Sequence, residues 1–150
     1  MRNIICMFCG HRDIINKVEI EYKVTEIIKD LIENKSVNIF YTGGMGDFDN
    51  ICSKCVRELK EKYSNIKLCL IIPYMTKDIL RNGEYYYSLY DEIIEPDMGD
   101  IFPKGAIAKR NRWMVDKSDY MVVYVKSDYG GAYNTMKYAL KNNKAITINI

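Results

Sequence analysis

The sequence predicts a doubly wound α/β fold, in which a mostly parallel sheet carries helices on both faces. Two observations support this prediction. Six short apolar or β-branched segments alternate with segments whose apolar residues recur at helical spacing. Several of the six segments are apolar on both faces, which is typical of parallel strands buried between two layers of helices.

The predicted strands are short and spread over the whole sequence. In chain order they comprise residues 4–9, 37–41, 66–72, 92–94, 120–125 and 145–150. Lys67 interrupts the third, and the fourth is the shortest. Because consecutive parallel strands need a crossover connection, each gap between them has to hold a helix or a long loop.

Four gaps contain a helical pattern, and one is ambiguous. The apolar faces are Val24, Ile27, Ile28, Leu31 and Ile32; Cys52, Cys55, Val56, Leu59 and Tyr63; Ile107, Asn111, Met114 and Val115; and Ala132, Met136, Ala139 and Leu140. The first of these helices should end near Asn34. Residues 84–88, Glu-Tyr-Tyr-Tyr-Ser, fit either a short helix or a lid.

Length and composition indicate one ordered domain over residues 1–150. Hydrophobic residues make up 48% and charged residues 28% of the chain, which are globular proportions. The apolar run at residues 4–8 is too short for a signal peptide or a membrane span, so we expect a cytoplasmic protein with no membrane partner. A net charge of +2 gives no electrostatic reason to expect a nucleic-acid partner.

Three glycine-bearing loops are the strongest candidates for a ligand site. They follow the first, second and fifth predicted strands, at residues 9–12, 42–49 and 128–132, and each precedes a predicted helix. Ligands of open parallel sheets bind outside the carboxyl ends of the strands. Glycine lets the backbone approach a ligand, and the amides at a helix N-terminus attract phosphate. The three loops together predict an anion cradle.

Basic and polar side chains accompany these loops. His11 and Arg12 follow the first strand, and Arg110 and Asn111 share one side of their helix with Met114. A hydrogen-bonded structural histidine and an ordinary amphipathic helix are the alternatives. The candidate ligand-binding residues are Gly10, His11, Arg12, Gly43, Gly44, Gly46, Asp47, Arg110, Asn111, Gly130 and Gly131.

Charge is unevenly distributed in the second half of the chain. Residues 82–103 contain six carboxylates and no Lys or Arg, whereas residues 104–117 are basic. Two interpretations remain open, solvated faces of a loop and a helix, or a cationic patch that faces an anionic ligand.

The cysteine spacing raises the question of zinc. Cys6-x-x-Cys9 and Cys52-x-x-Cys55 together match the spacing of a four-thiolate site. However, residues i and i+3 of a strand point to opposite faces, and Cys52 and Cys55 fit the buried stripe of a helix. We therefore predict five reduced thiols, no metal and no organic cofactor, with a zinc-stabilised interaction module as the third-ranked alternative.

Four motifs resemble the SLOG superfamily, Rossmann-like domains related to the lysine-decarboxylase-like LOG proteins. They are Phe-Cys-Gly-His-Arg at 8–12, Gly-Gly-Met-Gly-Asp at 43–47, Arg110-Asn111 with Met114, Val115 and Asp116, and Gly-Gly-Ala at 130–132. They span nearly the whole chain in the expected order. The resemblance implies a Rossmann-like fold, a pocket for a nucleotide or nucleotide-derived ligand, and a homodimer.

The same resemblance separates two functions. Relatives that hydrolyse nucleoside 5′-monophosphates carry the motif Gly-Gly-x-Gly-Thr-x-Glu. When this motif is aligned from Gly130 and Gly131, its third Gly, its Thr and its Glu correspond to Tyr133, Asn134 and Met136. The carboxylate that such a reaction needs is missing. Our first interpretation is therefore a module that senses or sequesters a nucleotide-like phosphate ligand. In it, Asp47 accepts hydrogen bonds from the ribose hydroxyls. The alternative is a phosphoribohydrolase or nucleosidase that uses Asp47 or Asp116 as its catalytic carboxylate.

Overall fold

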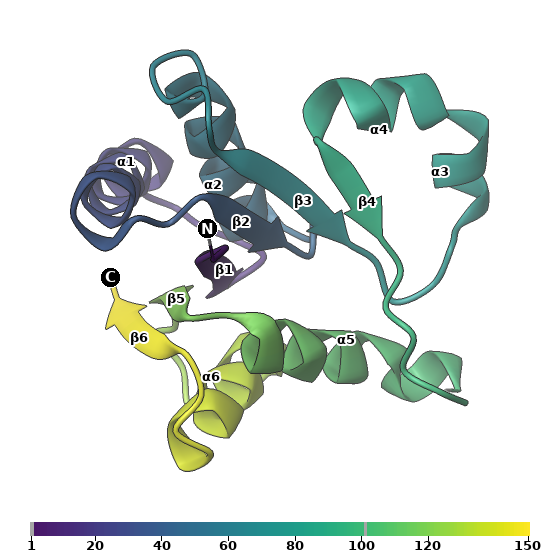
Figure 1. The fold of residues 1–150 in the computed structure, drawn as a ribbon. Coiled ribbons are helices and arrows are strands. Elements are labelled where there is room, and N and C mark those ends of the chain that lie inside the picture. Colours follow the sequence, from purple (N-terminus) through teal and green to yellow (C-terminus); the bar gives the residue numbers. More distant parts are fainter. Residues whose placement is uncertain (1, 101) are drawn as a thin grey trace.

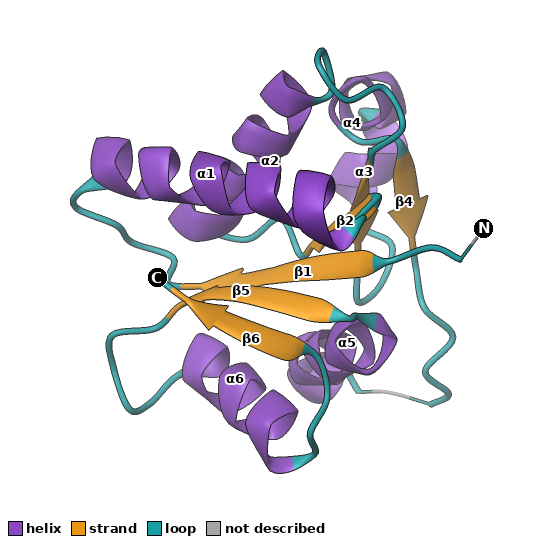
Figure 2. Cartoon of the chain, turned by 60° about the vertical axis from the view of Figure 1, so that its left-hand side comes forward, coloured by secondary structure: helices purple, strands orange, loops and turns teal. Residues whose placement is uncertain are grey.

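The computed structural model describes residues 2–100 and 102–150, and these form one parallel sheet with helices on both faces (Figures 1 and 2). The strands are β1 (Ile5–Gly10), β2 (Ile39–Thr42), β3 (Lys67–Ile71), β4 (Glu92–Ile94), β5 (Tyr120–Tyr124) and β6 (Ile146–Asn149). Each lies within two residues of its predicted bounds. The predicted fold class is confirmed.

Strand order reverses beside β1. The sheet runs β4-β3-β2-β1-β5-β6, so the chain builds outward from β1 to β4 and then crosses back to β5. Met7 of β1 is in register with Tyr41 of β2 on one side and Met121 of β5 on the other. The carboxyl ends of these three strands therefore meet at the switch point where ligands of doubly wound sheets bind.

The helices form two layers. Figure 2 shows α1 (Lys17–Lys35) and α2 (Asp47–Leu59) on one face, and α5 (Pro103–Lys117) and α6 (Gly131–Lys141) on the other. Two short helices, α3 (Lys77–Arg81) and α4 (Gly83–Leu89), lie beside β3 and β4 (Figure 1). The ambiguous tyrosine segment thus forms a short helix. Pro103 begins α5 at a position where its missing amide costs no hydrogen bond.

Alternation along β1 explains how the core is divided. Cys6 and Phe8 pack with α1 and α2, and the Phe8 ring stacks on Phe40 at 5.8 Å. Met7 and Cys9 point to the opposite face and pack with α5 and α6. All four side chains are buried, since a strand covered on both faces has no solvent side.

No helix within residues 2–100 and 102–150 has both the length and the apolar composition that crossing a bilayer requires.

Candidate functional site

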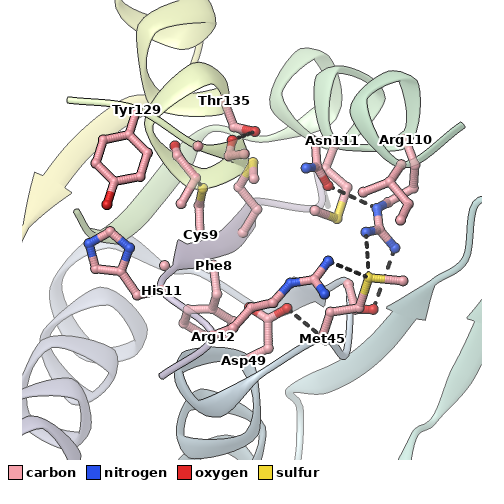
Figure 3. Close-up of a pocket in the computed structure, with 18 residues that line it drawn as sticks. Phe8, Cys9, His11, Arg12, Met45, Asp49, Arg110, Asn111, Tyr129 and Thr135 are labelled. Atoms are coloured by element: carbon pink, nitrogen blue, oxygen red, sulfur yellow. Dashed lines mark hydrogen bonds between the residues drawn. The ribbon is translucent and has the colours of Figure 1, made fainter. Parts of the chain in front are cut away.

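A cavity of about 250 Å³ lies at the switch point of the sheet (Figure 3). Its walls are the carboxyl end of β1, the loops that follow β1, β2 and β5, and the helix α5. The cavity is therefore bounded by the same three loops that carry the glycine motifs of the sequence, at the edge where a ligand is expected.

Most of the predicted site residues line this cavity. Those that do are Gly10, His11, Arg12, Gly43, Arg110, Asn111, Gly130 and Gly131. Gly44, Gly46, Asp47 and Asp116 do not. The arrangement brings together residues that lie more than 100 positions apart in the chain, because β1 pairs directly with β5.

Arg110 is the buried cation of the site, with only 2% of its surface exposed. Its Nη1 donates hydrogen bonds to the carbonyl of Ile71 at 2.8 Å and to the carbonyl of Gly43 at 3.4 Å. The guanidinium therefore bridges the ends of β3 and β2. Its Nε donates to Asn111 Oδ1 at 2.9 Å. Burial lowers the Arg110 pKa, and the charge of Asp49 opposes that effect.

Arg12 approaches Arg110 from the opposite wall (Figure 3). Both side chains direct a guanidinium nitrogen at the sulfur of Met45, at 3.9 Å from Arg12 and 3.6 Å from Arg110. A thioether is a weak acceptor. Within the described residues, neither guanidinium has a carboxylate oxygen within 4.0 Å. Within this part of the chain both cations are thus without an ion pair, although Arg110 already donates to two carbonyls and to Asn111.

Asp49 supplies the only carboxylate among the described residues that line the cavity. It is 8% exposed, and its Oδ2 accepts the main-chain amide of Met45 at 3.0 Å. Burial raises the pKa of Asp49 to about 6, although the Met45 amide and the charges of Arg110 and Arg12 favour the ionised form. The site thus holds a carboxyl group that changes charge near neutral pH.

Asp47 contacts the loop after β1 and does not line the cavity. Its Oδ2 accepts the amide of Ile14 at 2.9 Å and lies 3.5 Å from the ammonium of Lys17, which fixes the connection between β1 and α1. Asp116 lies on α5 and accepts the hydroxyl of Tyr138 at 2.8 Å. Neither carboxylate suggested by the sequence therefore reaches the place where a ligand would lie.

The N-terminus of α2 is already occupied by main chain. The amide of Asp47 donates to the Arg12 carbonyl at 2.8 Å, and that of Phe48 donates to the His11 carbonyl at 3.3 Å. These bonds use the amides that a helix start would otherwise offer to an anion. The second glycine loop consequently shapes the cavity, whereas the first two amides of its helix are already bonded and are not free for the predicted cradle.

Gly46 has a steric reason for being glycine. It precedes α2 with φ 89° and ψ −177°, and a Cβ there would lie 2.5 Å from the Arg12 Cα. At Gly10 a Cβ would lie 2.4 Å from the Phe48 ring, which is fully buried. These two glycines let the first and second loops pack directly against each other.

The N-terminus of α6 differs from that of α2. It is preceded by Gly130, with φ 96° and ψ 174°, and no side chain caps it. Gly130, Gly131 and Ala132 line the cavity, and Cys9 donates its thiol to the Ala132 carbonyl at 3.4 Å. The first residues of α6 therefore form part of the cavity wall.

His11 joins the first loop to the last. Its Nε2 accepts the main-chain amide of Lys126 at 2.7 Å, and its ring meets Tyr124 edge-on at 5.7 Å. An imidazole nitrogen that accepts a hydrogen bond carries no proton there. His11 lines the cavity, while this nitrogen holds the loop after β5 in place.

The cysteines are distributed in a way that excludes a shared thiolate site. Cys6 lies in the core on the α1 and α2 face, Cys9 lies on the other face, and Cys52 and Cys55 are buried along α2. Burial raises the pKa of Cys9 to about 12, so this thiol meets the cavity uncharged. No three metal-binding side chains are grouped within the described ranges.

Sequence reasoning missed Met45, and it named Asp49 only as a possible substitute carboxylate, outside its list of site residues. A signal for Asp49 was available, because it stands three positions before Cys52 and seven before Val56 and so extends the buried stripe of α2. Met45 had no such signal, since its place between two guanidinium groups depends on the packing of α5 against the loop after β2.

Comparison with known proteins agrees with this architecture. The chain matches the model of the YpsA family, described as the YspA SLOG family, over residues 6–149. The uncharacterised SPbeta prophage-derived protein YoqJ of Bacillus subtilis strain 168 is 26% identical over 140 residues, which cover 83% of this chain and 82% of YoqJ.

Two solved structures share the fold. DNA processing protein A from Helicobacter pylori, described with a single-stranded DNA binding mode, has a TM-score of 0.64 at 16% identity. The match covers 95% of this chain and 63% of that one, so the present chain spans less than two thirds of that protein. The Moco carrier protein of Chlamydomonas rheinhardtii has a TM-score of 0.58 at 15% identity, covering 100% of this chain and 77% of the other.

Identities this low show similarity of fold alone. The family model, in contrast, covers nearly the whole length of the chain, including every loop around the cavity. The resemblance found in the sequence motifs is confirmed, and the protein belongs to the YspA SLOG family.

Proposed function

We propose that this protein binds a nucleotide or nucleotide-derived phosphate ligand in the cavity at the switch point, and that its role is to sense or sequester that ligand. The convergence of Arg12 and Arg110 carries the proposal. Both guanidinium groups line the same cavity, and each contacts the Met45 thioether. A phosphate at this position would replace a weak sulfur acceptor by charged oxygen acceptors.

Geometry around the two cations supports a phosphate in particular. The uncapped N-terminus of α6 adds Gly130, Gly131 and Ala132 to the cavity wall, and no heavy atom lies within 4 Å of the position of a Cβ at Gly131, which leaves room for a ligand. The guanidinium of Arg110 is held by two strand-end carbonyls, so its orientation is fixed before a ligand arrives. Such preorganisation reduces the entropy lost on binding.

A screen of ligands tests the proposal. The purified protein is heated with nucleoside monophosphates, dinucleotides and cyclic nucleotides, and each stabilising compound is then analysed by chromatography for conversion. A rise in melting temperature with the ligand recovered intact supports a binding module. If no compound of these classes stabilises the protein, the proposal fails for them.

One observation favours a second candidate function, hydrolysis of the N-glycosidic bond of a nucleoside 5′-monophosphate. Asp49 lies in the cavity with its pKa raised to about 6, and it could serve where the usual Glu is missing. This assignment replaces Asp47 and Asp116, the candidates suggested by the sequence. Release of free base during the screen would support hydrolysis.

Substitution of Arg12 gives a direct prediction. Arg12→Ala should weaken phosphate-ligand binding by about 1.5–3 kcal/mol, because charged hydrogen bonds to phosphate are lost. Calorimetric titration of both proteins with the best ligand of the screen measures the change. Arg81→Ala, which removes an Arg from α3, is the control and should bind normally. Equal affinity of a folded Arg12→Ala variant and the unchanged protein would exclude Arg12 from the site.

The expectations about oligomeric state, nucleic-acid binding and cellular location stay predictions. The SLOG resemblance implies a homodimer, which light scattering during gel filtration would detect. The net charge of +2 argues against nucleic acid as a partner, and a gel-shift assay with single-stranded DNA tests this. A cytoplasmic location is testable by cell fractionation.

A further inference from the structure

The first cavity is small for a nucleotide site. Sites for small organic ligands usually have volumes of roughly 300–1,000 Å³, and this one has about 250 Å³. A ligand larger than this space extends beyond it, and the shape of the surrounding surface decides where.

A second hollow continues from the first. This α5–α6 groove, of about 330 Å³, lies between the two helices. It shares Ile107, Asn111, Gly131 and Thr135 with the first cavity, so these four residues line both spaces. The two spaces are therefore adjacent, and a ligand held at Arg12 and Arg110 can extend over Asn111 toward the groove.

Charge in the groove is positive. Lys104 and Arg112 line it, and no carboxylate does so among the described residues. Asp116, which lies four positions after Arg112, does not line the groove and accepts the hydroxyl of Tyr138. Within the described part of the chain, neither Lys104 nor Arg112 forms an ion pair or lies over an aromatic ring.

Helical spacing places the two cations on one line. Lys104, Ala108 and Arg112 follow each other at intervals of four residues, so they share one face of α5 over about 12 Å. The small side chain of Ala108 lies exposed between them and leaves space for an anionic group. The long side chains on either side can close on that group, while Asn134 of α6 lines the groove as a further polar side chain.

We propose that the α5–α6 groove is a second anion subsite, and that the ligand is a nucleotide with two separate phosphate groups. This inference rests on the proposed function, since it assumes that the first phosphate lies between Arg12 and Arg110. The second phosphate lies over Ala108, between Lys104 and Arg112. The nucleoside portion spans the shared residues Asn111 and Gly131.

Matched ligands test this assignment. The four common nucleoside 5′-monophosphates and the corresponding 3′,5′-bisphosphates are titrated calorimetrically against the unchanged protein. For at least one base, the bisphosphate should bind at least tenfold more tightly than the monophosphate. Higher salt should reduce this preference, because the additional contact is between exposed charges.

Paired variants locate the effect. Lys104→Ala combined with Arg112→Ala should abolish the preference for the bisphosphate and leave monophosphate affinity unchanged. Lys117→Ala combined with Lys137→Ala removes the same charge outside the groove, from residues that lie over Trp113 and Tyr133, and should keep the preference. Circular dichroism confirms folding of each variant.

The possible failures are distinguishable. If neither ligand class binds, the proposed function fails for these mononucleotides, and the second subsite fails with it. Monophosphate binding without any gain from the second phosphate overturns the subsite alone. An equal loss of preference in both pairs of variants would also overturn it, because the effect would then come from net charge rather than from the groove.

Discussion

Gly46→Ala is expected to destabilise the protein by about 3–5 kcal/mol. The backbone at Gly46, with φ 89° and ψ −177°, lies in a region that is essentially restricted to glycine, and this strain alone costs about 1–3 kcal/mol. The new Cβ would lie 2.5 Å from the Arg12 Cα, so the loop after β1 must also move. Urea unfolding at pH 7 measures the loss.

Gly130→Ala is the matched control. Gly130 precedes α6 with nearly the same backbone angles, φ 96° and ψ 174°, but no heavy atom lies within 4 Å of the position of a new Cβ. Only the strain should appear, about 1–3 kcal/mol. If both variants lose the same stability, contact between the two loops is not what requires glycine at position 46.

The second large effect is expected at Asp49. Burial raises its pKa from 3.8 to about 6, so the folded state binds this proton more tightly than the unfolded chain. The contribution of Asp49 to stability is therefore greatest below pH 4 and is lost as the pH rises through 6. Asp49→Asn should stabilise the protein at pH 7.5 by on the order of 1–3 kcal/mol, since Asn can still accept the Met45 amide.

Unfolding curves between pH 4 and pH 8 check this expectation. The difference between Asp49→Asn and the unchanged protein should grow with pH across the interval from 4 to 7. Asp47→Asn serves as the control. It removes the negative charge that pairs with Lys17, so it should not raise stability at neutral pH. A loss of stability in Asp49→Asn at pH 7.5 would contradict the assigned cost of burying the carboxylate.

The same variant separates the two candidate functions. In a binding module, the ionised Asp49 repels a phosphate, so Asp49→Asn should bind the ligand more tightly at pH 7.5. In a hydrolase that uses Asp49, the substitution should abolish release of the base. Calorimetry and chromatography on one protein preparation distinguish these outcomes.

Sequence patterns predicted the fold better than the site. The central strands were recognisable because a strand buried on both faces is apolar at successive positions, as in residues 4–9. The partly exposed edge strands β4 and β6 were recognisable from their short β-branched runs. The position of the cavity followed as well, since parallel strands bring their carboxyl ends to one edge. Eight of the predicted site residues line it, among them Arg12 and Arg110.

The errors arose where side-chain direction mattered. Asp47 and Asp49 are two residues apart in α2, so successive turns of about 100° direct them to opposite sides of the helix. Asp47 therefore binds the preceding loop, and Asp49 faces the cavity. The contact of Met45 with two guanidinium groups and the groove between α5 and α6 depend on packing between distant segments, which spacing within one segment does not encode.

The central position of β1 also determines when the cavity can exist during synthesis. The amide of Ile5 donates to the carboxylate of Asp119 at 2.9 Å, across 114 residues of chain. On the ribosome, β1 therefore emerges long before the strand that covers its second edge. Such distant pairing makes folding slow and leaves an apolar edge exposed in the meantime. A nascent chain that lacks β5 and the residues after it contains thirteen of the eighteen residues that line the cavity, and the part of the wall formed by the loop after β5 and by α6 is still missing.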